Sequence, residues 1–452
     1  MASPKRVAGV MELLPFDQLL LEEIIKRIKS VFIRFGFLPI STPLFEFKET
    51  LLKKNSLQTQ KQIYFLSSSG SIKRDKPPKY AVRYDLTVPL ARYVAQNQEK
   101  LLFPFKRFQI QKVYRGESPQ AGRYREFYQC DADVIGKNKL SFDYDGEMGV
   151  IIYTLLNSLF IDDFTIFISN RNFFKALFYH LKIEDENLGL DIIRTIDKSE
   201  KFGSKFLEKS LEKSSLNKEQ IISILDFVKI KEKNSFALKK RLNSLGISNS
   251  FLNDGLQQLE SVIEGFETTG VPDKNYEINL KIARGLDYYT GNIFEAVLNS
   301  FPELGSICSG GRYEDLVQSF SKLKSPGVGI SLGLTRLFNY IKKNKITKFN
   351  ISSPIKVMIA NFGYKFFKSY KEIAKELRSE GVNTLIYFQQ NKPSKQFRFA
   401  SASGIKFVLI LGENEEKRDI ISIKDIDKKE QRDIDRNHLC RYIKEKLNII
   451  KS

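Results

Sequence analysis

The chain has 452 residues, 42% of them hydrophobic and 28% charged, and its formal net charge at neutral pH is +20. This length allows about three domains of roughly 150 residues, and the lack of any uncharged apolar run of about 18 residues excludes a membrane-spanning helix. The positive charge favours a polyanionic partner such as a nucleic acid, although skewed codon usage in an AT-rich genome would also give a Lys-rich chain without Trp.

Cysteine and histidine are scarce. Cys130, Cys308 and Cys440 form no CxxC pair, so we expect neither a disulfide framework nor a zinc site. We also expect a reducing cytosol as the compartment. The start, MASPKRVAGVMELLPFDQ, contains Pro, Glu and Asp too early for a signal peptide. His180 and His438 are expected to be structural or surface residues. The chemistry should therefore use Arg, carboxylates, Gln and Tyr rather than a His base.

The first third of the chain predicts a helix followed by mixed elements. Residues 16–36 form an amphipathic pattern that ends at Gly36. Its apolar stripe comprises Leu20, Ile24, Ile28, Val31 and Phe35. An extended segment with Pro39 and Pro43 follows, and short strands alternate with helices over about 80–170. Helical periodicity rich in Lys and Glu then predicts a helical insertion at about 175–270.

The last third predicts a return to strands and then a separate module. Strand character with frequent glycine occupies 275–333, and we place a linker at 346–354 because it is polar and ends in proline. Over 355–452, three compact apolar strands alternate with helical stretches that end at Gly381 and Gly404. This pattern indicates a small α/β domain, and its 21 Lys and Arg against 13 Asp and Glu make it basic.

The segment RYDLTVPLARYVAQN (83–97) opens a predicted helix. Thr87 is a plausible N-cap and Pro89 fits the first turn. Asp85 lies just outside the helix, and capping does not explain it.

The segment 105–136 predicts two antiparallel strands joined by a loop with Gly116 and Gly122. Alternation places Tyr128, Cys130, Ala132 and Val134 of the second strand on a core face. The opposite face carries Arg123, Arg125, Phe127, Gln129, Asp131 and Asp133. Such a face suits a polar ligand that is anionic at one end and has hydrogen-bond donors at the other. A solvated outer face is the alternative.

Two further segments carry unusual residues. ARGLDYYTGNIFEAVL (283–298) places Arg284, Tyr288 and Tyr289 in a turn-rich stretch before a predicted strand, and CSGGRYEDLV (308–317) follows. In SPGVGISLG (325–333) one face consists of glycines and Ser331. This face suits close approach of a flat ring such as adenine, or tight helix–sheet packing. Arg336 follows in the next helix.

No P-loop occurs and no GxGxxG follows a strand. Nucleotide binding would therefore depend on arginines on an antiparallel sheet rather than on a helix N-terminus.

These segments together resemble histidyl-tRNA synthetases over nearly the whole chain. VYRGESPQAGRYREFYQ resembles class II motif 2, GVGISLGLTRL resembles motif 3, and GFLPISTPLFE (36–46) resembles motif 1, which forms dimer contacts in the class. ARGLDYYTG and SGGRYEDLV resemble the two histidine-specific motifs. The resemblance implies an α/β (α+β) fold with a class II catalytic domain at 1–345, whose mainly antiparallel sheet is flanked by helices, and an anticodon-binding domain at 355–452.

The resemblance also implies a function and partners. The chain would activate L-histidine with ATP and transfer it to the 3′-terminal adenosine of tRNA(His), in the cytoplasm, as a homodimer without membrane attachment. Mg²⁺ would accompany ATP, and no set of metal-ligating residues is identified.

Six residues are implied to bind substrate histidine: Asp85, Thr87, Gln129, Asp133, Tyr288 and Tyr289. The first three would hold its ammonium group. Asp133 and Tyr289 would recognise the imidazole, with Tyr288 beside them.

Five residues are implied to act on ATP. Arg115 would contact the α-phosphate, Arg123 and Arg336 the distal phosphates, and Phe127 would lie against the adenine. Arg284 would contact both the α-phosphate and the substrate carboxylate, which makes Arg284 and Arg115 the catalytic candidates.

The chain departs from the family pattern at three places. GVME (9–12), including Met11, stands where Gly-Thr-Arg-Asp is usual, Asp315 replaces a glycine, and Thr335 replaces a common acidic residue. None is expected to touch an assigned residue, so we expect an active enzyme. Two alternatives are a catalytically inactive paralogue, such as the regulatory subunit of a short ATP phosphoribosyltransferase, and a non-enzymatic tRNA-sensing module.

Overall fold

The computed structural model describes residues 4–52, 60–118, 124–285, 288–314, 317–346, 348–349 and 351–449. The chain divides into two compact units, Met1–Lys348 and Phe349–Ser452. In the described part of the chain, no helix is both long enough and apolar enough to span a membrane.

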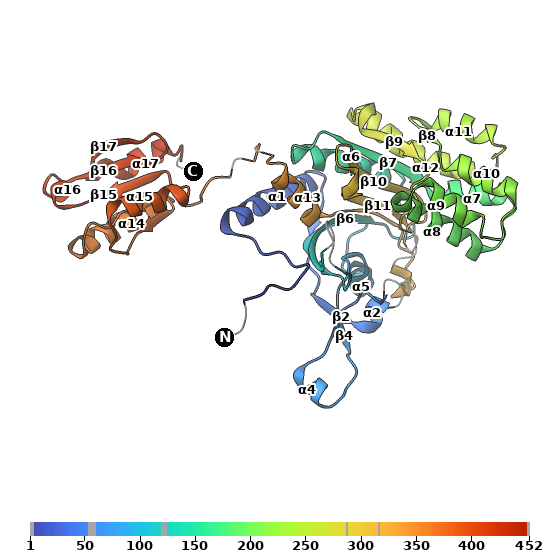
Figure 1. The fold of residues 1–452 in the computed structure, drawn as a ribbon, viewed down its shortest axis with the longest axis horizontal. Helices are drawn as coiled ribbons and strands as arrows, with labels where there is room; N and C mark the ends of the chain where they lie inside the picture. Colours follow the sequence, from blue (N-terminus) through green and yellow to red (C-terminus); the bar gives the residue numbers. More distant parts are fainter. Residues whose placement is uncertain are drawn as a thin grey trace. The chain divides into compact units, whose positions relative to one another are not determined.

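A nine-stranded sheet organises the first unit (Figure 1). Its strands in spatial order are β1 (Leu38–Pro39), β5 (Phe105–Tyr114), β6 (Glu126–Ile135), β12 (Gly327–Leu332), β11 (Cys308–Tyr313), β10 (Asn292–Leu298), β7 (Phe164–Asn170), β9 (Tyr276–Asn279) and β8 (Lys231–Glu232). The β1–β5 and β7–β9 pairs are parallel and the others antiparallel. The predicted mainly antiparallel sheet is thus confirmed.

The predicted hairpin over 105–136 is present as β5 and β6. Cys130, Ala132 and Val134 are fully buried, as their alternation predicts. Asp131 and Asp133, on the opposite face, are also buried, with 2% and 5% exposure. At these two positions the face is therefore not a solvated outer face, whereas Arg125, Phe127 and Gln129 on the same face are partly exposed.

The predicted N-terminal helix is α1 (Pro15–Arg34), and Gly36 follows it with a φ of +79°. Its buried side chains are Leu21, Ile24, Ile28, Val31 and Phe32. The buried stripe is thus shifted from the predicted one, and Leu20 and Phe35 are only partly buried. Two more helices of this unit are α6 (Asp143–Ser158) and α13 (Leu334–Lys343).

The prediction that Thr87 caps its helix is wrong. Helix α5 (Thr87–Asn97) begins at Thr87, and Leu86 occupies the cap position without a side-chain hydrogen bond. The Asp85 carboxylate instead accepts a hydrogen bond of 3.1 Å from the Val88 backbone N–H. Asp85 therefore satisfies one of the free donors of the first turn.

Six helices form the insertion, gathered beside β7, β9 and β8 (Figure 1). They are α7 (Arg171–His180), α8 (Glu186–Phe202), α9 (Ser204–Leu211), α10 (Lys218–Phe227), α11 (Ser235–Ser244) and α12 (Ser250–Thr269). Asn217, Asn234 and Asn249 cap three of them by accepting backbone hydrogen bonds, as short polar side chains do at this position. The helical character predicted for about 175–270 is confirmed.

A small three-stranded sheet lies N-terminal to α5 in the sequence. It comprises β2 (Phe45–Phe47), β4 (Tyr80–Val82) and β3 (Phe65–Leu66), with the short helices α2 (Lys48–Leu52) and α4 (Ser69–Lys73). Several of its large apolar side chains are exposed: Phe45, Phe47, Phe65, Leu66 and Tyr80.

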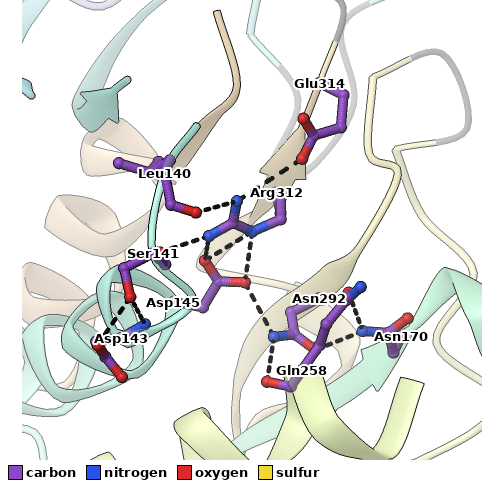
Figure 2. Close-up of polar contacts among 9 residues, drawn as sticks. All are labelled: Leu140, Ser141, Asp143, Asp145, Asn170, Gln258, Asn292, Arg312 and Glu314. Carbon is purple, nitrogen blue, oxygen red and sulfur yellow. Dashed lines mark hydrogen bonds and ion pairs between the residues drawn. The ribbon is translucent and has the colours of Figure 1, made fainter. Parts of the chain in front are cut away.

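A buried polar network joins the sheet to its covering helices (Figure 2). The Arg312 guanidinium of β11 donates to both oxygens of Asp145 in α6 at 2.8 to 3.1 Å. Asn292 of β10 donates to Asp145 at 2.9 Å, and Asn170 of β7 donates to Asn292 at 2.7 Å. Because each group has a partner, the burial of this ion pair is tolerated.

The second unit has a five-stranded sheet in the order β14 (Thr384–Ile386), β13 (Val357–Ile359), β15 (Phe407–Ile410), β16 (Ile420–Asp425) and β17 (Glu430–Asp435). Its helices are α14 (Phe367–Ser379), α15 (Pro393–Ala402), α16 (Glu413–Lys417) and α17 (Leu439–Lys446). Separate apolar clusters cover the two faces of the sheet, because Val357 and Ile359 belong to one and Met358 to the other. The three predicted strands are confirmed, whereas β16 and β17 were not predicted.

The ion pair in Figure 2 predicts a stability loss. Among the described residues, replacing Asp145 with Ala leaves the buried Arg312 with only the longer carboxylate contact to Glu314 at 3.7 Å, so we expect the free energy of unfolding to fall by about 3–5 kcal/mol. Asp191→Ala is the matched control, because Asp191 pairs with Arg194 at 2.9 Å on an exposed helix face. That change should stay within about 0.5 kcal/mol. Urea unfolding followed by circular dichroism measures both, and equal effects would contradict a structural role for the pair.

Candidate active site

A small cavity of about 40 Å³ lies on the polar face of β6. Its lining includes Thr87, Asp131, Asp133, Tyr288, Tyr289 and Ser331. Four of these, Thr87, Asp133, Tyr288 and Tyr289, were expected to bind the amino acid, and they come from three segments between positions 87 and 289. The fold therefore brings the expected residues of α5, β6 and the 283–290 loop to one place.

Asp133 is held by fixed partners on both oxygens. Arg107, opposite it on β5, forms an ion pair at 2.6 Å with Oδ2, and the Tyr313 hydroxyl donates to Oδ1 at 3.0 Å. Burial raises the pKa of Asp133, while Arg107 and the Tyr313 hydrogen bond oppose that rise. The charge of Asp133 is thus compensated by a guanidinium that is itself fully buried.

Asp131 has a different environment, two residues before Asp133 on the same face. The Ser331 hydroxyl of β12 donates to its Oδ1 at 2.5 Å. Gln129 donates from Nε2 to the same hydroxyl at 2.8 Å, while its buried Oε1 has no hydrogen-bond partner among the described residues. Burial raises the pKa of Asp131 to about 7, which Arg107 partly opposes and Asp133 reinforces.

Asp85 and Tyr288 face each other at the start of α5. The Tyr288 hydroxyl donates to Asp85 Oδ2 at 3.2 Å and lies 2.7 Å from the Tyr84 hydroxyl. Burial raises the pKa of Asp85, while the Val88 N–H and the nearby charge of Arg115 lower it. These contacts hold the Asp85 carboxylate, which the family resemblance implies would bind the ammonium group of the substrate.

Tyr289 is positioned by glycines and by a buried arginine. Gly285 has a φ of +71°, and a Cβ there would come within 2.1 Å of the Tyr289 ring. Arg171, at the start of α7, donates to the carbonyls of Arg284 at 2.6 Å and Tyr289 at 3.3 Å. Burial lowers the pKa of Arg171 to about 10. Arg171 is not recognisable from the sequence, because its role depends on backbone partners more than 110 residues away.

Arg115 and Phe127, for which the family resemblance implies separate contacts with ATP, lie together. The Arg115 guanidinium is 5.0 Å from the centre of the Phe127 ring, and its Nε donates to the Tyr84 carbonyl at 3.1 Å. A cation over an aromatic face is a favourable arrangement. Arg123, expected to contact the distal phosphates, lies outside the described residues.

Arg284 is surrounded by carboxylates that the sequence analysis did not identify. Its Nε lies 2.9 Å from Glu295 of β10, and its Nη2 lies 2.8 Å from Glu200 of α8. Asp197 is 3.9 Å away. Burial alone would lower the pKa of Arg284, but Glu295 and Glu200 together raise it. The helical insertion thus contacts a residue expected to act on ATP.

Arg336 lies at the start of α13, and its Nη1 donates to the Ser306 carbonyl at 2.7 Å. The Ser306 hydroxyl donates to the Cys308 carbonyl at 2.9 Å. Burial raises the pKa of Glu295 to about 7 against the opposing charge of Arg284.

The glycine-rich strand β12 leaves less open space than the close approach of an adenine ring would need. A Cβ at Gly329 would lie 2.0 Å from Asp133 Oδ1, and one at Gly327 would lie 2.4 Å from the Tyr313 ring. At these two positions, neighbouring side chains fill the space, so close packing explains the glycines. Gly333 differs, because its nearest neighbour would be the Ile307 carbonyl at 3.6 Å.

Two of the three departures from the family pattern meet at one small cavity. Met11 and Thr335 line a space of about 60 Å³ together with Phe127. The Thr335 hydroxyl accepts a hydrogen bond of 2.9 Å from the Tyr128 backbone N–H. These departures therefore border an assigned residue, which the sequence analysis did not expect. Asp315 lies outside the described residues.

Family models match both units. The model described as histidyl-tRNA synthetase matches residues 9–337, and the model described as anticodon binding domain matches residues 356–446.

Curated relatives match over their whole length. The chain is 39% identical to a histidine–tRNA ligase of Xanthomonas oryzae pv. oryzae, covering 97% of each chain, and 39% identical to one of Stenotrophomonas maltophilia, covering 99% of each.

Solved structures agree. A crystal structure of histidyl-tRNA synthetase from Nostoc sp. is similar with a TM-score of 0.84 and 36% identity, covering 99% of this chain and 100% of that one. A Bacillus halodurans structure described as an ATP phosphoribosyltransferase regulatory subunit/histidyl-tRNA synthetase is 18% identical with a TM-score of 0.73, a likeness of fold alone.

Proposed function

The chain belongs to the histidyl-tRNA synthetase family, and we propose how its residues divide the work of that reaction. It is a histidine–tRNA ligase: it activates histidine with ATP, releasing pyrophosphate, and transfers the histidyl group to tRNA. Because full-length relatives at 39% identity are such ligases, the inactive-paralogue and tRNA-sensing alternatives are set aside.

The substrate histidine binds along the polar face of β6. Its ammonium group is held by Asp85, Thr87 and Gln129. Two observations support this placement: Asp85 is a buried carboxylate, and the Oε1 atom of Gln129 is a buried acceptor without a partner among the described residues. The imidazole lies toward Asp133 and Tyr289, with Tyr288 fixing the Asp85 side of the pocket.

ATP binds through arginines from separate segments. Arg115 contacts the α-phosphate, and the adenine lies against Phe127. Arg123 and Arg336 contact the distal phosphates. Arg284 approaches the α-phosphate and the substrate carboxylate, and for this its guanidinium must exchange the Glu200 contact for the ligand.

The first step needs positioning rather than a base. The substrate carboxylate is already ionised, so its oxygen attacks the α-phosphorus directly, and the bond to pyrophosphate breaks. Arg115 and Arg284 stabilise the charge on the pentavalent phosphorus. In the second step a ribose hydroxyl of the tRNA attacks the carbonyl carbon of the histidyl group, and AMP leaves.

Mg²⁺ enters with ATP. Hard oxygen ligands suit this ion, and the partly exposed carboxylates of Glu200 and Asp197 beside Arg284 are of that type. When bound, the ion offsets the negative charge of the phosphates. The magnesium dependence of exchange in Glu200→Gln measures this contribution, and an unchanged dependence would exclude Glu200.

The domain and cellular assignments complete the proposal. Residues 1–345 carry catalysis, with the insertion at about 175–270, residues 346–354 link the domains, and residues 355–452 bind the anticodon of tRNA(His). The enzyme works in the cytoplasm as a homodimer. The exposed apolar side chains near residues 36–46, including Leu38, Leu44 and Phe45, support a dimer contact at that place.

Removing the Arg284 side chain should nearly abolish adenylate formation. For Arg284→Ala we expect histidine-dependent ATP–pyrophosphate exchange to fall by about 10²- to 10³-fold, while tRNA affinity stays nearly unchanged. Arg194→Ala, an exposed arginine of α8, is the control and should keep full exchange. The unmodified enzyme, assayed with all twenty amino acids, should respond to histidine. Equal loss of exchange and tRNA binding would make Arg284 structural.

Deleting residues 355–452 should damage tRNA charging more than exchange. The basic C-terminal module supplies anticodon contacts, whereas the first unit holds the residues proposed for adenylate formation. Comparing kcat/KM for charging with kcat/KM for exchange tests the division. A larger loss in exchange would contradict it.

A charge on the proposed dimer surface should separate the subunits. The unmodified chain should sediment at about twice 52.2 kDa, and Phe45→Lys should sediment as a monomer. Phe236→Lys changes a still more exposed phenylalanine of α11 and should remain dimeric. A monomeric unmodified chain would contradict the proposal.

A further inference from the structure

Two carboxylates stand side by side in the histidine pocket, and their surroundings differ in charge. Asp133 forms an ion pair with Arg107 at 2.6 Å and accepts from Tyr313 at 3.0 Å. Asp131 accepts a hydrogen bond from the Ser331 hydroxyl and, within the described residues, forms no ion pair. If both carboxylates are ionised, they carry two negative charges, and Arg107 balances only one of them.

Strand register produces this difference. Asp133 lies between Arg107 of β5 and Gly329 of β12, whereas Asp131 lies between Gln109 and Ser331 on the same two strands. The absence of a side chain at Gly329 makes room for the Asp133 carboxylate, which sits where a Cβ would be. Both carboxylates line the cavity, but Asp133 is paired with a cation across the sheet, whereas Asp131 has the neutral Ser331 as its neighbour.

A buried carboxylate without a cation destabilises the free protein. Asp131 is 2% exposed, and its principal fixed contact is a single hydroxyl. Groups that weaken a free protein in this way are common at binding sites, where the ligand supplies the missing partner. The ligand proposed for this cavity has a ring with N–H donors and an ionisable charge.

We propose that Asp131 is a specificity-determining residue, whose carboxylate accepts a hydrogen bond from a ring N–H of the substrate histidine and supplies the negative charge that Asp133 commits to Arg107. The inference rests on the proposed placement of histidine in this pocket. It adds a residue to which the family resemblance gave no role.

Ser331 orients this carboxylate and couples it to the other end of the substrate. Its hydroxyl accepts from Gln129 Nε2 at 2.8 Å and donates to Asp131 at 2.5 Å. The same hydroxyl therefore fixes Gln129, which is assigned to the ammonium group, and Asp131, which is assigned to the ring. Ser331 is a positioning residue in this scheme.

The groups that act electrostatically on Asp131 come from each neighbouring element. They are Arg107 of β5, Asp133 and Cys130 of β6, Cys308 of β11, Asp85 before α5, and Tyr289 of the 283–290 loop. Arg107 lies close enough to lower the pKa of Asp131, but burial outweighs it and raises that pKa to about 7. The pocket thus favours a positively charged or strongly donating ring.

Kinetics of Asp131→Asn test the proposal. We expect its KM for histidine in the exchange reaction to rise by about 10- to 100-fold, the size of a hydrogen bond to a charged group, with kcat changed only a few-fold. The analogue β-(1,2,4-triazol-3-yl)alanine has a similar shape but a less basic ring that stays uncharged at neutral pH. Its KM should rise less, so discrimination between the two amino acids falls. Ser331→Ala, which keeps the carboxylate, should show a smaller effect in the same direction.

Several outcomes would overturn the inference. An unchanged KM for histidine, or an equal rise for histidine and the triazole analogue, would show that Asp131 does not sense the ring. A joint loss of kcat and ATP affinity would make the residue structural. If the unmodified enzyme lacks histidine-dependent exchange, the proposed function itself fails, which is a separate result.

Stability of the ligand-free protein gives an independent readout. Because the pKa of Asp131 is higher in the folded state, about 7 against an ordinary value of 3.8, the native state binds more protons between these two pH values. Stability from this group is therefore present at low pH and is lost as pH rises through about 7. Asp131→Asn should raise the melting temperature at pH 8 and have little effect at pH 4. A lower melting temperature of Asp131→Asn than of the unmodified protein at pH 8 would contradict the claim that the Asp131 carboxylate reduces stability in favour of binding.

Discussion

Guanidinium–carboxylate pairs between neighbouring elements hold both faces of the large sheet. Arg107 compensates Asp133 from the adjacent strand, and Glu295 pairs with Arg284 on the same face. On the opposite face, Arg312 of β11 compensates Asp145 of the covering helix α6. A buried charge without its partner is strongly destabilising, so these pairs fix which strands and helices lie side by side. The site depends on this constraint, because its reactive groups are attached to the same elements.

Two of the arginines proposed to bind ATP already have protein partners. Arg284 contacts Glu295 within the sheet and Glu200 in the insertion, and Arg336 contacts the Ser306 carbonyl. Such contacts limit the rotamer freedom that each guanidinium would lose on binding a ligand. The contact with Glu200 also ties the helical insertion to Arg284, so movement of α8 would change the charge beside this guanidinium.

Close packing, rather than space for a ligand, explains two of the glycines in strand β12. The Asp133 carboxylate occupies the place of a side chain at Gly329, and the Tyr313 ring does so at Gly327. The pocket that results is narrow and lined by side chains whose orientations are fixed by partners on both sides. Buried polar groups of this kind reject ligands that leave them unpaired, which is the property a synthetase selective for a small aromatic amino acid requires.

The sequence alone determined the local features: the hairpin of β5 and β6, the helix α1, and the common face of Gln129, Asp131 and Asp133, because side-chain periodicity is set by the backbone geometry of each element. It missed β17 because that exposed strand carries no apolar alternation, and it missed β16 although the first four residues of that strand are buried. Only the tertiary structure decided which carboxylate meets a cation. Strand register places Arg107 opposite Asp133 and Ser331 beside Asp131, and the fold brings Glu200 to Arg284 across 84 positions. No local pattern encodes such long-range pairings, so the charge balance of the site becomes visible only once the sheet is assembled.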